Sequence, residues 1–384
     1  MKILIATDSY LPRLGGAEMY AYKLASHLKS DGHEINLLTT EPGEWTHDHE
    51  FPVFRRAFSK NPFVFFPSLI LYFNLIRKSD VVHTVYSHKL AAIGGLFSRL
   101  LGKKMIISEQ GRGILDLPDN SFFYSKVHEL YRAVAIKSSN LFIASCLEFV
   151  EIAKRYTSNK KIVYQPNSVD TEEFSPSEKD YSLLPFTYEN QPLVFIVRRM
   201  VPKNGVQFLV EAAPFVLTDY PNVQFVHIGW GMLDGYLKKR VRELGIQKNF
   251  HFLGKIENEN LKSYLNLADV VVFPSTAEAT SIACLEAMSL EKPIVASRVG
   301  GFPEMVTDDW NGYLVNLTDT EHSNYDAAMT LSDDKLSKLA NAVISIVNDS
   351  EKRQLFGERS RARAIEKFSW KHNIKKIINW YSQF

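Results

Sequence analysis

The chain has 384 residues, 45% of them hydrophobic, and its 45 Lys and Arg residues nearly balance 43 Asp and Glu residues. This length predicts two domains, because a domain usually holds about 100–200 residues, and the formal charge of +2 gives no reason to expect a nucleic-acid partner. Two cysteines are too few for a disulfide framework or a cysteine-based zinc site, which suits a reducing cytoplasm.

Short apolar runs alternate with helical patterns along the first half of the chain. Lys2–Thr7 predicts a buried strand, and a helix opens at Gly15-Gly16, with its apolar residues three and four positions apart. Glu34–Thr39, Val81–His83 and Met105–Ser108 continue the series of strands. Strands that alternate with helices of this length indicate right-handed βαβ units and a parallel, doubly wound sheet.

An apolar run of 14 residues, Phe63–Ile76, lies between two of these strands and is broken by Pro67 and Asn74. A membrane-spanning helix needs about 18 apolar residues, so this run is too short to span. We expect its aromatic residues in the core of the first domain; the alternative is a patch that faces an anionic membrane, because basic residues flank it. The N-terminus lacks the layout of a cleavable signal, so we expect a cytoplasmic protein whose membrane contact is at most peripheral. The flanking basic residues are Arg55, Arg56, Lys60, Arg77 and Lys78.

The pattern stops between residues 166 and 192, where four prolines stand among polar residues, a composition typical of an inter-domain connection. A last amphipathic helix, Trp370–Phe384, is expected to return to the first half of the chain. We therefore predict a Rossmann-like domain at 1–170, joined by the helix at 370–384, and a second such domain at 171–369. The strands predicted in the second domain are Leu193–Val197, Val223–Ile228, Phe250–Leu253, Val270–Phe273 and Ile294–Ala296.

The most informative stretch runs from Phe273 to Glu304. A strand ends there, a polar loop follows, and Thr280 or Ser281 can cap a helix that starts near Ile282. Backbone N–H groups at the start of such a helix bind anions, and open α/β sheets bind their ligands at the carboxyl ends of strands. The stretch is thus a predicted site for an anionic ligand.

Two glutamates, Glu278 and Glu286, lie on either side of this helix start. Eight residues of helix span about 12 Å, whereas the two carboxylates of a glycosidase lie about 5–9.5 Å apart. The spacing therefore argues against a hydrolytic acid and nucleophile. It favours separate roles, with one glutamate facing a sugar at the loop and the other binding a second part of the ligand from the helix.

With these residues the sequence resembles the retaining glycosyltransferases of family 4, a glycogen-synthase-like group with the GT-B fold. The E-x7-E element of Glu278 and Glu286, followed by Gly-Gly-x-Pro-Glu at 300–304, carries the resemblance. It implies two Rossmann-like domains that face each other across a cleft, and transfer of a sugar from a nucleotide-sugar with retention at the anomeric carbon. Further matches in the family's order cover nearly the whole chain: Gly15-Gly16-Ala17-Glu18, Asp80–His83, Gln165–Asp170, Val197–Gly205 and Asn311-Gly312.

The resemblance implies a role for each donor-site residue. Glu278 would face the donor sugar, Glu286 would bind the ribose hydroxyls, and Arg199 with Lys203 would hold the diphosphate. Glu278, Arg199 and Lys203 are the expected catalytic residues, because an arginine fork and a lysine charge stabilise negative charge on the departing phosphate. The other donor-binding residues would be Gly15, Gly16, Thr280, Ser281 and Arg198, with the backbone of the two glycines closing over the phosphates.

Three departures from the family pattern concern the donor side and the connection. Arg198 stands at the family's glycine and Asn204 at its lysine, with Lys203 one position early. Either Lys203 swings in to serve the phosphates, or Arg198 supplies the missing charge. Ser168 replaces the glycine of the family's Pro-Asn-Gly segment.

The acceptor side is expected in the first domain, at Glu109, Gln110 and His83. Family members often carry a histidine near the position of Gln110, which can bond a sugar hydroxyl but cannot take a proton. His83, at a strand end, also suits an ordinary core histidine.

The resemblance also implies the substrates. The donor would be a UDP- or GDP-sugar, with UDP favoured, and the acceptor a glycan or lipid-linked sugar of cell-surface polysaccharide or glycolipid synthesis. No Asp-x-Asp sequence occurs in the chain, in agreement with the family's metal independence, so neither a metal nor another cofactor is expected. Two alternatives stay open: a nucleotide-sugar 2-epimerase of the same fold, and a binding protein that keeps the donor site but has lost turnover.

Overall fold

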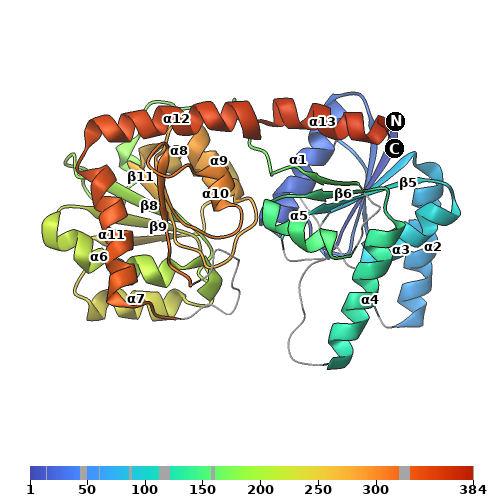
Figure 1. Ribbon diagram of the computed structural model, residues 1–384, viewed down its shortest axis with the longest axis horizontal. Coiled ribbons are helices and arrows are strands. Elements are labelled where there is room, and N and C mark those ends of the chain that lie inside the picture. The colour runs from blue at the N-terminus through green and yellow to red at the C-terminus, as the bar shows by residue number, and fades with distance from the viewer. Residues whose placement is uncertain are drawn as a thin grey trace. The chain divides into compact units, whose positions relative to one another are not determined.

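The computed structural model describes residues 1–13, 15–43, 50–59, 61–85, 89–111, 122–156, 161–319 and 329–383, with the backbone alone at 122–128 and 161. The chain divides into two compact units (Figure 1). Unit 1 consists of Met1–Asn167 with Trp370–Phe384, and unit 2 of Ser168–Ser369. Each unit contains a parallel sheet covered by helices, which confirms the predicted α/β class.

The sheet of unit 1 has seven parallel strands in the order β3-β2-β1-β4-β5-β6-β7. The central strand β4 is buried along its whole length because helices cover both faces of the sheet, and this explains its near-continuous apolar sequence. The order of strands reverses between β1 and β4. The strands are β1 (Lys2–Thr7), β2 (Glu34–Thr39), β3 (Val53–Arg55), β4 (Val81–Val85), β5 (Lys104–Glu109), β6 (Leu141–Ala144) and β7 (Lys161–Tyr164).

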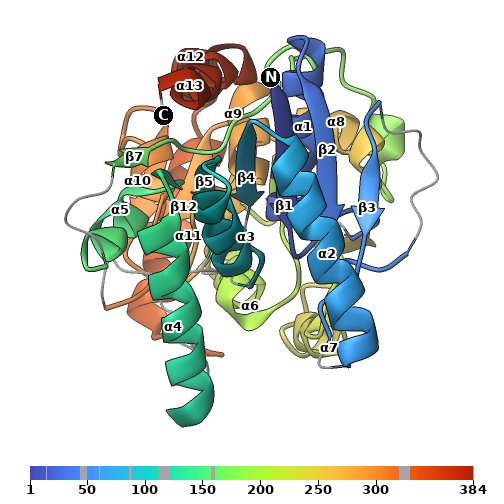
Figure 2. The same cartoon turned by 90° about the vertical axis from the view of Figure 1, so that its right-hand side faces the viewer.

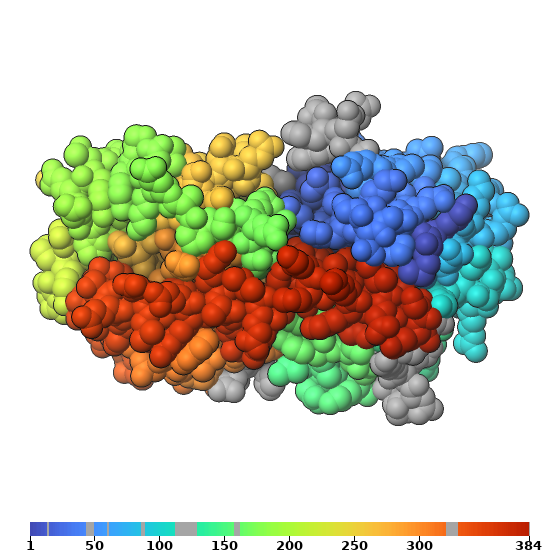
Figure 3. Space-filling model, turned by 90° about the horizontal axis from the view of Figure 1, so that it is seen from above, coloured from blue at the N-terminus to red at the C-terminus, as the bar shows by residue number. Residues whose placement is uncertain are grey.

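Helices cover both faces of this sheet. α2, α3 and α4 lie side by side over one face (Figure 2), and α1 lies on the other. α13 runs along α1 at the surface of unit 1 (Figure 3), where Trp370 stacks on His27 with ring centroids 5.0 Å apart. The helices are α1 (Gly16–Ser30), α2 (Pro62–Lys78), α3 (Lys89–Leu100), α4 (Phe122–Ser138), α5 (Leu147–Lys154) and α13 (Trp370–Gln383).

Helix α2 corrects the expectation that the aromatic run of residues 63–73 lies in the core. Its inner face buries Tyr72 and Ile76, but Phe63 is 89% exposed and Phe66 and Ile70 are also exposed. The helical period of 3.6 residues places these three side chains on the solvent side. Among the described residues, no helix combines the length and apolar character that crossing a membrane requires.

The sheet of unit 2 has six parallel strands in the order β10-β9-β8-β11-β12-β13, which reverses between β8 and β11. The two faces of each strand enter different cores: Val194 and Ile196 of β8 pack with α6, α7 and α11, while Leu193 and Phe195 pack with α8, α9 and α10. The strands are β8 (Leu193–Val197), β9 (Gln224–Ile228), β10 (Phe250–Gly254), β11 (Val270–Phe273), β12 (Ile294–Ser297) and β13 (Gly312–Val315). The helices are α6 (Val206–Asp219), α7 (Asp234–Glu243), α8 (Asn258–Leu267), α9 (Ile282–Ser289), α10 (Phe302–Met305), α11 (Asp333–Val347) and α12 (Ser350–Phe368).

The proline-rich segment at 168–192 is part of unit 2. The backbone N–H of Val169 donates to the carbonyl of Phe368 at 2.8 Å, and Phe174 and Leu184 are buried in the same core as α9. The rings of Tyr181 and Tyr188 stack 3.7 Å apart. The segment that composition alone described as a connection is therefore packed, and the chain passes from unit 1 to unit 2 directly before Ser168.

Candidate functional site

The candidate site of unit 2 lies where its strand order reverses. Open α/β sheets bind ligands in the crevice beyond the carboxyl ends of the strands at such a reversal. Arg198 directly follows β8, and the loop from Ser275 to Glu278 follows β11, the neighbouring strand. Two motifs that are 80 residues apart in the sequence therefore meet here.

An ion pair between Arg198 and Glu278 occupies this position. Arg198 Nη2 donates both to a Glu278 carboxylate oxygen and to Ser275 Oγ, the latter at 2.9 Å. The guanidinium lies over the rings of Phe273 and Phe302, 5.2 and 5.7 Å from their centroids. Because the two side chains are only 11% and 18% exposed, water screens the pair weakly.

Helix α9 begins beside this pair, at Ile282 as predicted. Ser281 caps it, because its Oγ accepts the N–H of Cys284 at 3.4 Å, and Thr280 is buried next to it. Burial raises the pKa of the Cys284 thiol, while the Arg198 charge lowers it and the Glu278 charge raises it. Glu278 stands three residues before the Ser281 cap, so the pair that it forms with Arg198 lies near the start of α9. Glu286 is on the same helix and is 8% exposed.

The loop after β8 carries the other predicted cations. Arg199 is exposed and forms no ion pair with a described residue, so its guanidinium can meet a ligand. Lys203 lies in a 3-10 turn, η2 (Pro202–Asn204), and its carbonyl accepts the N–H of Thr276 at 2.8 Å. Asn204 is buried, and its Nδ2 donates to the carbonyl of Arg199 at 2.9 Å. Asn204 thus fixes the shape of the loop and is not itself directed at a ligand.

Three residues that were not among the predicted site residues hold this loop in place. Gly229 and Gly231 have φ of +143° and +159°, and a Cβ on them would lie 2.0 Å from the carbonyl oxygen of Arg198 and 2.4 Å from that of Met200. His227 Nε2 donates to the Arg198 carbonyl at 2.9 Å. Burial lowers the pKa of His227 to about 4, although this hydrogen bond raises it, so the ring is neutral near pH 7. A glycine pair just after a strand was the available signal.

The predicted residues of unit 1 lie at the carboxyl end of its sheet. Gly15 precedes α1, which starts at Gly16, and a Cβ on Gly15 would lie 2.4 Å from Glu18 Oε2. Glu109 ends β5 and accepts the N–H of Gly111 at 3.3 Å. Gln110 is 8% exposed, and neither polar atom of its amide has a hydrogen-bond partner among the described residues. That amide is free to bond a ligand.

The acceptor-side assignment of His83 is not supported. The ring is fully buried within unit 1, with Nδ1 hydrogen-bonded to Tyr381 Oη and Nε2 2.7 Å from Ser108 Oγ. Burial lowers its pKa to about 3, so it stays neutral. Both nitrogens are engaged by the protein, and His83 acts as a core residue that ties α13 to the sheet.

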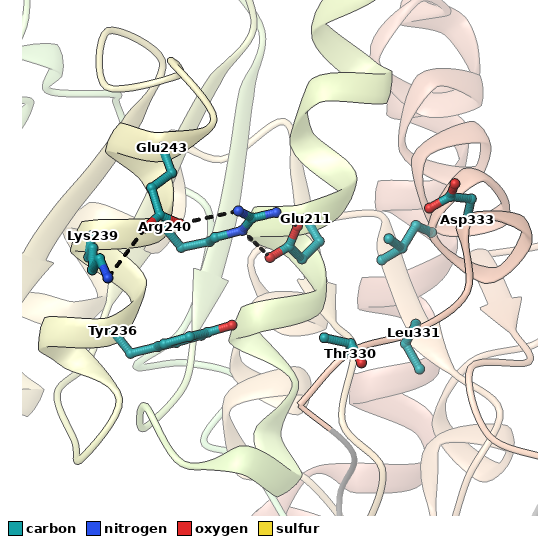
Figure 4. A pocket seen from close by; sticks show the side chains of 9 residues that line it. Glu211, Tyr236, Lys239, Arg240, Glu243, Thr330, Leu331 and Asp333 are labelled. Atoms are coloured by element: carbon teal, nitrogen blue, oxygen red, sulfur yellow. Dashed lines mark hydrogen bonds and ion pairs between the residues drawn. The ribbon is translucent and has the colours of Figure 1, made fainter.

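A cavity of about 310 Å³ lies elsewhere in unit 2, between α6, α7 and α11 (Figure 4). It is lined by an ion pair in which Arg240 Nε and Nη2 donate to the two carboxylate oxygens of Glu211, at 2.6 and 2.9 Å. Arg240 Nη1 also donates to Glu243 at 3.2 Å. These charges satisfy one another, and none of the strand-end residues lines the cavity, so we assign it no part in the site.

Comparisons with known proteins also divide the chain into two parts. Residues 14–173 match the family described as Glycosyltransferase Family 4, and residues 185–363 match the family described as Glycosyl transferases group 1. An uncharacterized glycosyltransferase of Methanocaldococcus jannaschii is 23% identical to this chain, over 99% of this chain and 98% of its own length. The UDP-Gal:alpha-D-GlcNAc-diphosphoundecaprenol alpha-1,3-galactosyltransferase of Escherichia coli is 26% identical, over 87% of this chain and 89% of its own.

The solved structures show the same fold. The crystal structure of Anabaena HepE in complex with UDP superimposes with a TM-score of 0.82 and 20% identity, and the match covers 100% of both chains. A likeness at this identity concerns the fold alone. Together with the two family matches it identifies the chain as a glycosyltransferase of the GT-B fold, with a family 4 domain followed by a group 1 domain.

Proposed function

We propose that this glycosyltransferase moves a sugar, with retention, from a nucleotide-sugar to a glycan or lipid-linked acceptor in cell-surface polysaccharide or glycolipid synthesis. The observation that carries the proposal is the cluster at the strand reversal of unit 2. There Arg198 and Arg199 follow β8, and Glu278 and the start of α9 follow β11. Cations beside a helix N-terminus suit a diphosphate.

UDP is the favoured nucleotide. The E. coli relative is named for a UDP-sugar donor and a diphosphoundecaprenol-linked acceptor, and the Anabaena structure holds UDP. In this reading Glu286 binds the ribose hydroxyls, Glu278 faces the sugar, and Arg199 with Lys203 stabilises charge on the leaving diphosphate. Thr280 and Ser281 line the donor site, and Gly15, Gly16, Glu109 and Gln110 of unit 1 serve the phosphates and the acceptor.

We also propose that the reaction needs no metal. The loop after β8 places Arg198, Arg199 and Lys203 within six consecutive residues, and these three positive charges can balance a diphosphate as a divalent cation does elsewhere. Transfer should therefore proceed unchanged in excess EDTA. Loss of activity in EDTA, restored by Mg²⁺ or Mn²⁺, would contradict this part of the proposal.

A peripheral contact with an anionic membrane completes the proposal. Phe63, Phe66 and Ile70 form an exposed apolar row on α2. Lipid-linked acceptors lie at such a surface, and basic residues favour anionic headgroups. The two neighbouring helices α2 and α3 hold four basic residues and no acidic one: Arg77, Lys78, Lys89 and Arg99.

The experiment begins with calorimetric titration of UDP and GDP, followed by a panel of their sugars with a lipid-linked sugar acceptor. We expect UDP binding, UDP release in step with glycosylated product, and an anomeric proton signal that shows retention. Interconversion of the donor sugar without matching UDP release would instead indicate an epimerase. Binding without release from any donor would indicate a protein that has lost turnover.

A further inference from the structure

The loop after β8 differs from the family pattern in the position of one positive charge. Asn204 stands where family members have lysine, and its buried amide bonds the carbonyl of Arg199. Arg198 stands where they have glycine, and its guanidinium reaches Glu278 and Ser275. Relative to that pattern, the positive charge stands at the other end of a seven-residue loop.

We propose that Arg198 binds the donor diphosphate beside Arg199 and Lys203, and that Glu278 holds its guanidinium until the diphosphate takes over. The inference rests on the proposed function and names the residue that completes its phosphate site. It also gives Glu278 a second role, as the internal counter-ion of Arg198.

The position of Arg198 supports a phosphate-binding role. Its guanidinium lies at the strand reversal and is paired with Glu278, three residues before the Ser281 cap of α9, where the helix dipole is positive. A cation near a positive helix end is stabilised by an anionic partner, and the Glu278 carboxylate is that partner. A diphosphate carries more charge than one carboxylate and offers more oxygens to an arginine fork.

Arg198 can also donate a further hydrogen bond. The rings of Phe273 and Phe302 pack against the guanidinium, and Gly229 with His227 fixes the backbone at its carbonyl. Its Nε is buried and has no hydrogen-bond partner among the described residues. A buried N–H without a partner costs free energy, which a phosphate oxygen would recover.

The proposal makes Glu278 and the diphosphate competitors for one arginine. Removing the charge of Glu278 should therefore strengthen the binding of UDP, which has no sugar for Glu278 to contact. The same change should slow sugar transfer, because Glu278 is expected to face the donor sugar. If Glu278 only contributed to binding the nucleotide, removing its charge would instead weaken the binding of UDP.

The test is calorimetric titration of UDP and GDP into the full chain and its variants. Arg198→Ala should weaken binding at least about tenfold, as loss of a charged hydrogen bond does, and Arg198→Lys should weaken it less. Glu278→Gln should bind UDP more tightly and transfer more slowly.

Arg240→Ala is the matched control, because Arg240 also pairs with a glutamate, Glu211, but away from the strand ends (Figure 4). It should leave the UDP affinity unchanged, and thermal unfolding should show that each variant is folded. Equal UDP affinity of wild type and folded Arg198→Ala, or weaker UDP binding by Glu278→Gln, would overturn the inference. Wild-type protein that binds neither nucleotide would instead contradict the proposed function.

Discussion

Arg199 and Glu286 have different expected roles at the two ends of the donor site, and their variants should fail differently. Arg199→Ala should lower kcat about 10²-fold or more, because charge on the leaving phosphate develops in the transition state. Glu286→Ala should mainly weaken UDP affinity and raise KM, because ribose contacts are equal in the ground and transition states. Steady-state kinetics with calorimetry separate the two. Normal turnover by Arg199→Ala would remove Arg199 from the phosphate site.

Lys292, in the loop between α9 and β12, makes the stability of the protein depend on pH. Burial lowers its pKa to about 7, with nearby Lys179 adding to the effect, while Asp269 and Glu291 raise it; its Nζ donates to the carbonyl of Asn266 at 2.7 Å. An unfolded lysine titrates near 10.4, so between about pH 7 and 10 the unfolded chain binds more protons. The free energy of unfolding should therefore rise with pH across this window. As pH falls, this contribution is lost between about pH 10 and 7, and below about pH 7 it does not change further.

Urea unfolding at several pH values tests this, with Lys292→Met as the comparison. The variant keeps the length of the side chain but cannot titrate there. The free energy of unfolding of the wild type minus that of the variant should therefore increase between pH 7 and 10. A difference that does not vary with pH would show that Lys292 is charged in the folded state.

At the scale of elements, the Asn-Gly motif at 311–312 has a structural explanation. Asn311 is fully buried, and its Oδ1 accepts the N–H of Thr307 at 2.7 Å. Gly312 opens β13 against Ile294 of β12, and a Cβ on it would lie 1.9 Å from the Ile294 carbonyl oxygen. The pair thus seats the edge strand of unit 2 closely on its neighbour.

Gly312→Ala should therefore destabilise the protein by about 1–3 kcal/mol, because a backbone carbonyl cannot move aside as a side-chain end can. Gly235→Ala is the control: it lies in helix α7 with no atom within 4 Å of a new Cβ, and it should be neutral or stabilise by up to about 1 kcal/mol. Urea unfolding of both variants measures the contrast, and equal effects would contradict the explanation from close packing.

At the scale of the whole molecule, charge is divided between the two halves of the chain. Residues 1–170 hold 21 Lys and Arg against 16 Asp and Glu, and residues 171–384 hold 24 against 27. The basic half contains the exposed apolar row of α2, whereas the acidic half contains the proposed donor site. This division suits one unit that meets an anionic surface and another whose binding of phosphate depends on local cations.

Replacing Phe63, Phe66 and Ile70 together by serine should reduce binding to vesicles that contain phosphatidylglycerol, because it removes the apolar row that would enter the interface. The folded core should be unaffected, since all three side chains are exposed. Co-sedimentation measures the bound fraction, and vesicles of phosphatidylcholine alone should bind less of the wild type. The control replaces Leu355 and Ile365, two exposed apolar residues of α12 in unit 2. Equal binding by the triple variant and the wild type would exclude α2 as the contact.

Local sequence determined the fold class and several element ends. Lys2–Thr7, Glu34–Thr39 and Leu193–Val197 are strands with the predicted bounds, because strands buried on both faces must be continuous apolar runs. Ser281, one of the two residues predicted to cap α9, is its cap. The edge strands β3 and β13 escaped prediction because they are short and only partly buried, whereas the equally short β11 is buried throughout and reads as a continuous apolar run.

The arrangement of the site depended on tertiary structure. Strand order decides that the ends of β8 and β11 are neighbours, and so it brings Arg198 to Glu278 and the Gly229–Gly231 turn to Arg198. The fold likewise buries His83 in the core and leaves the side chain of Phe63 exposed to solvent. The sequence by itself determined two parallel α/β units and the residues available for phosphate chemistry, because propensity and periodicity act locally. Only the fold decided which of those residues meet, because contacts between distant positions depend on how the strands are ordered in the sheet.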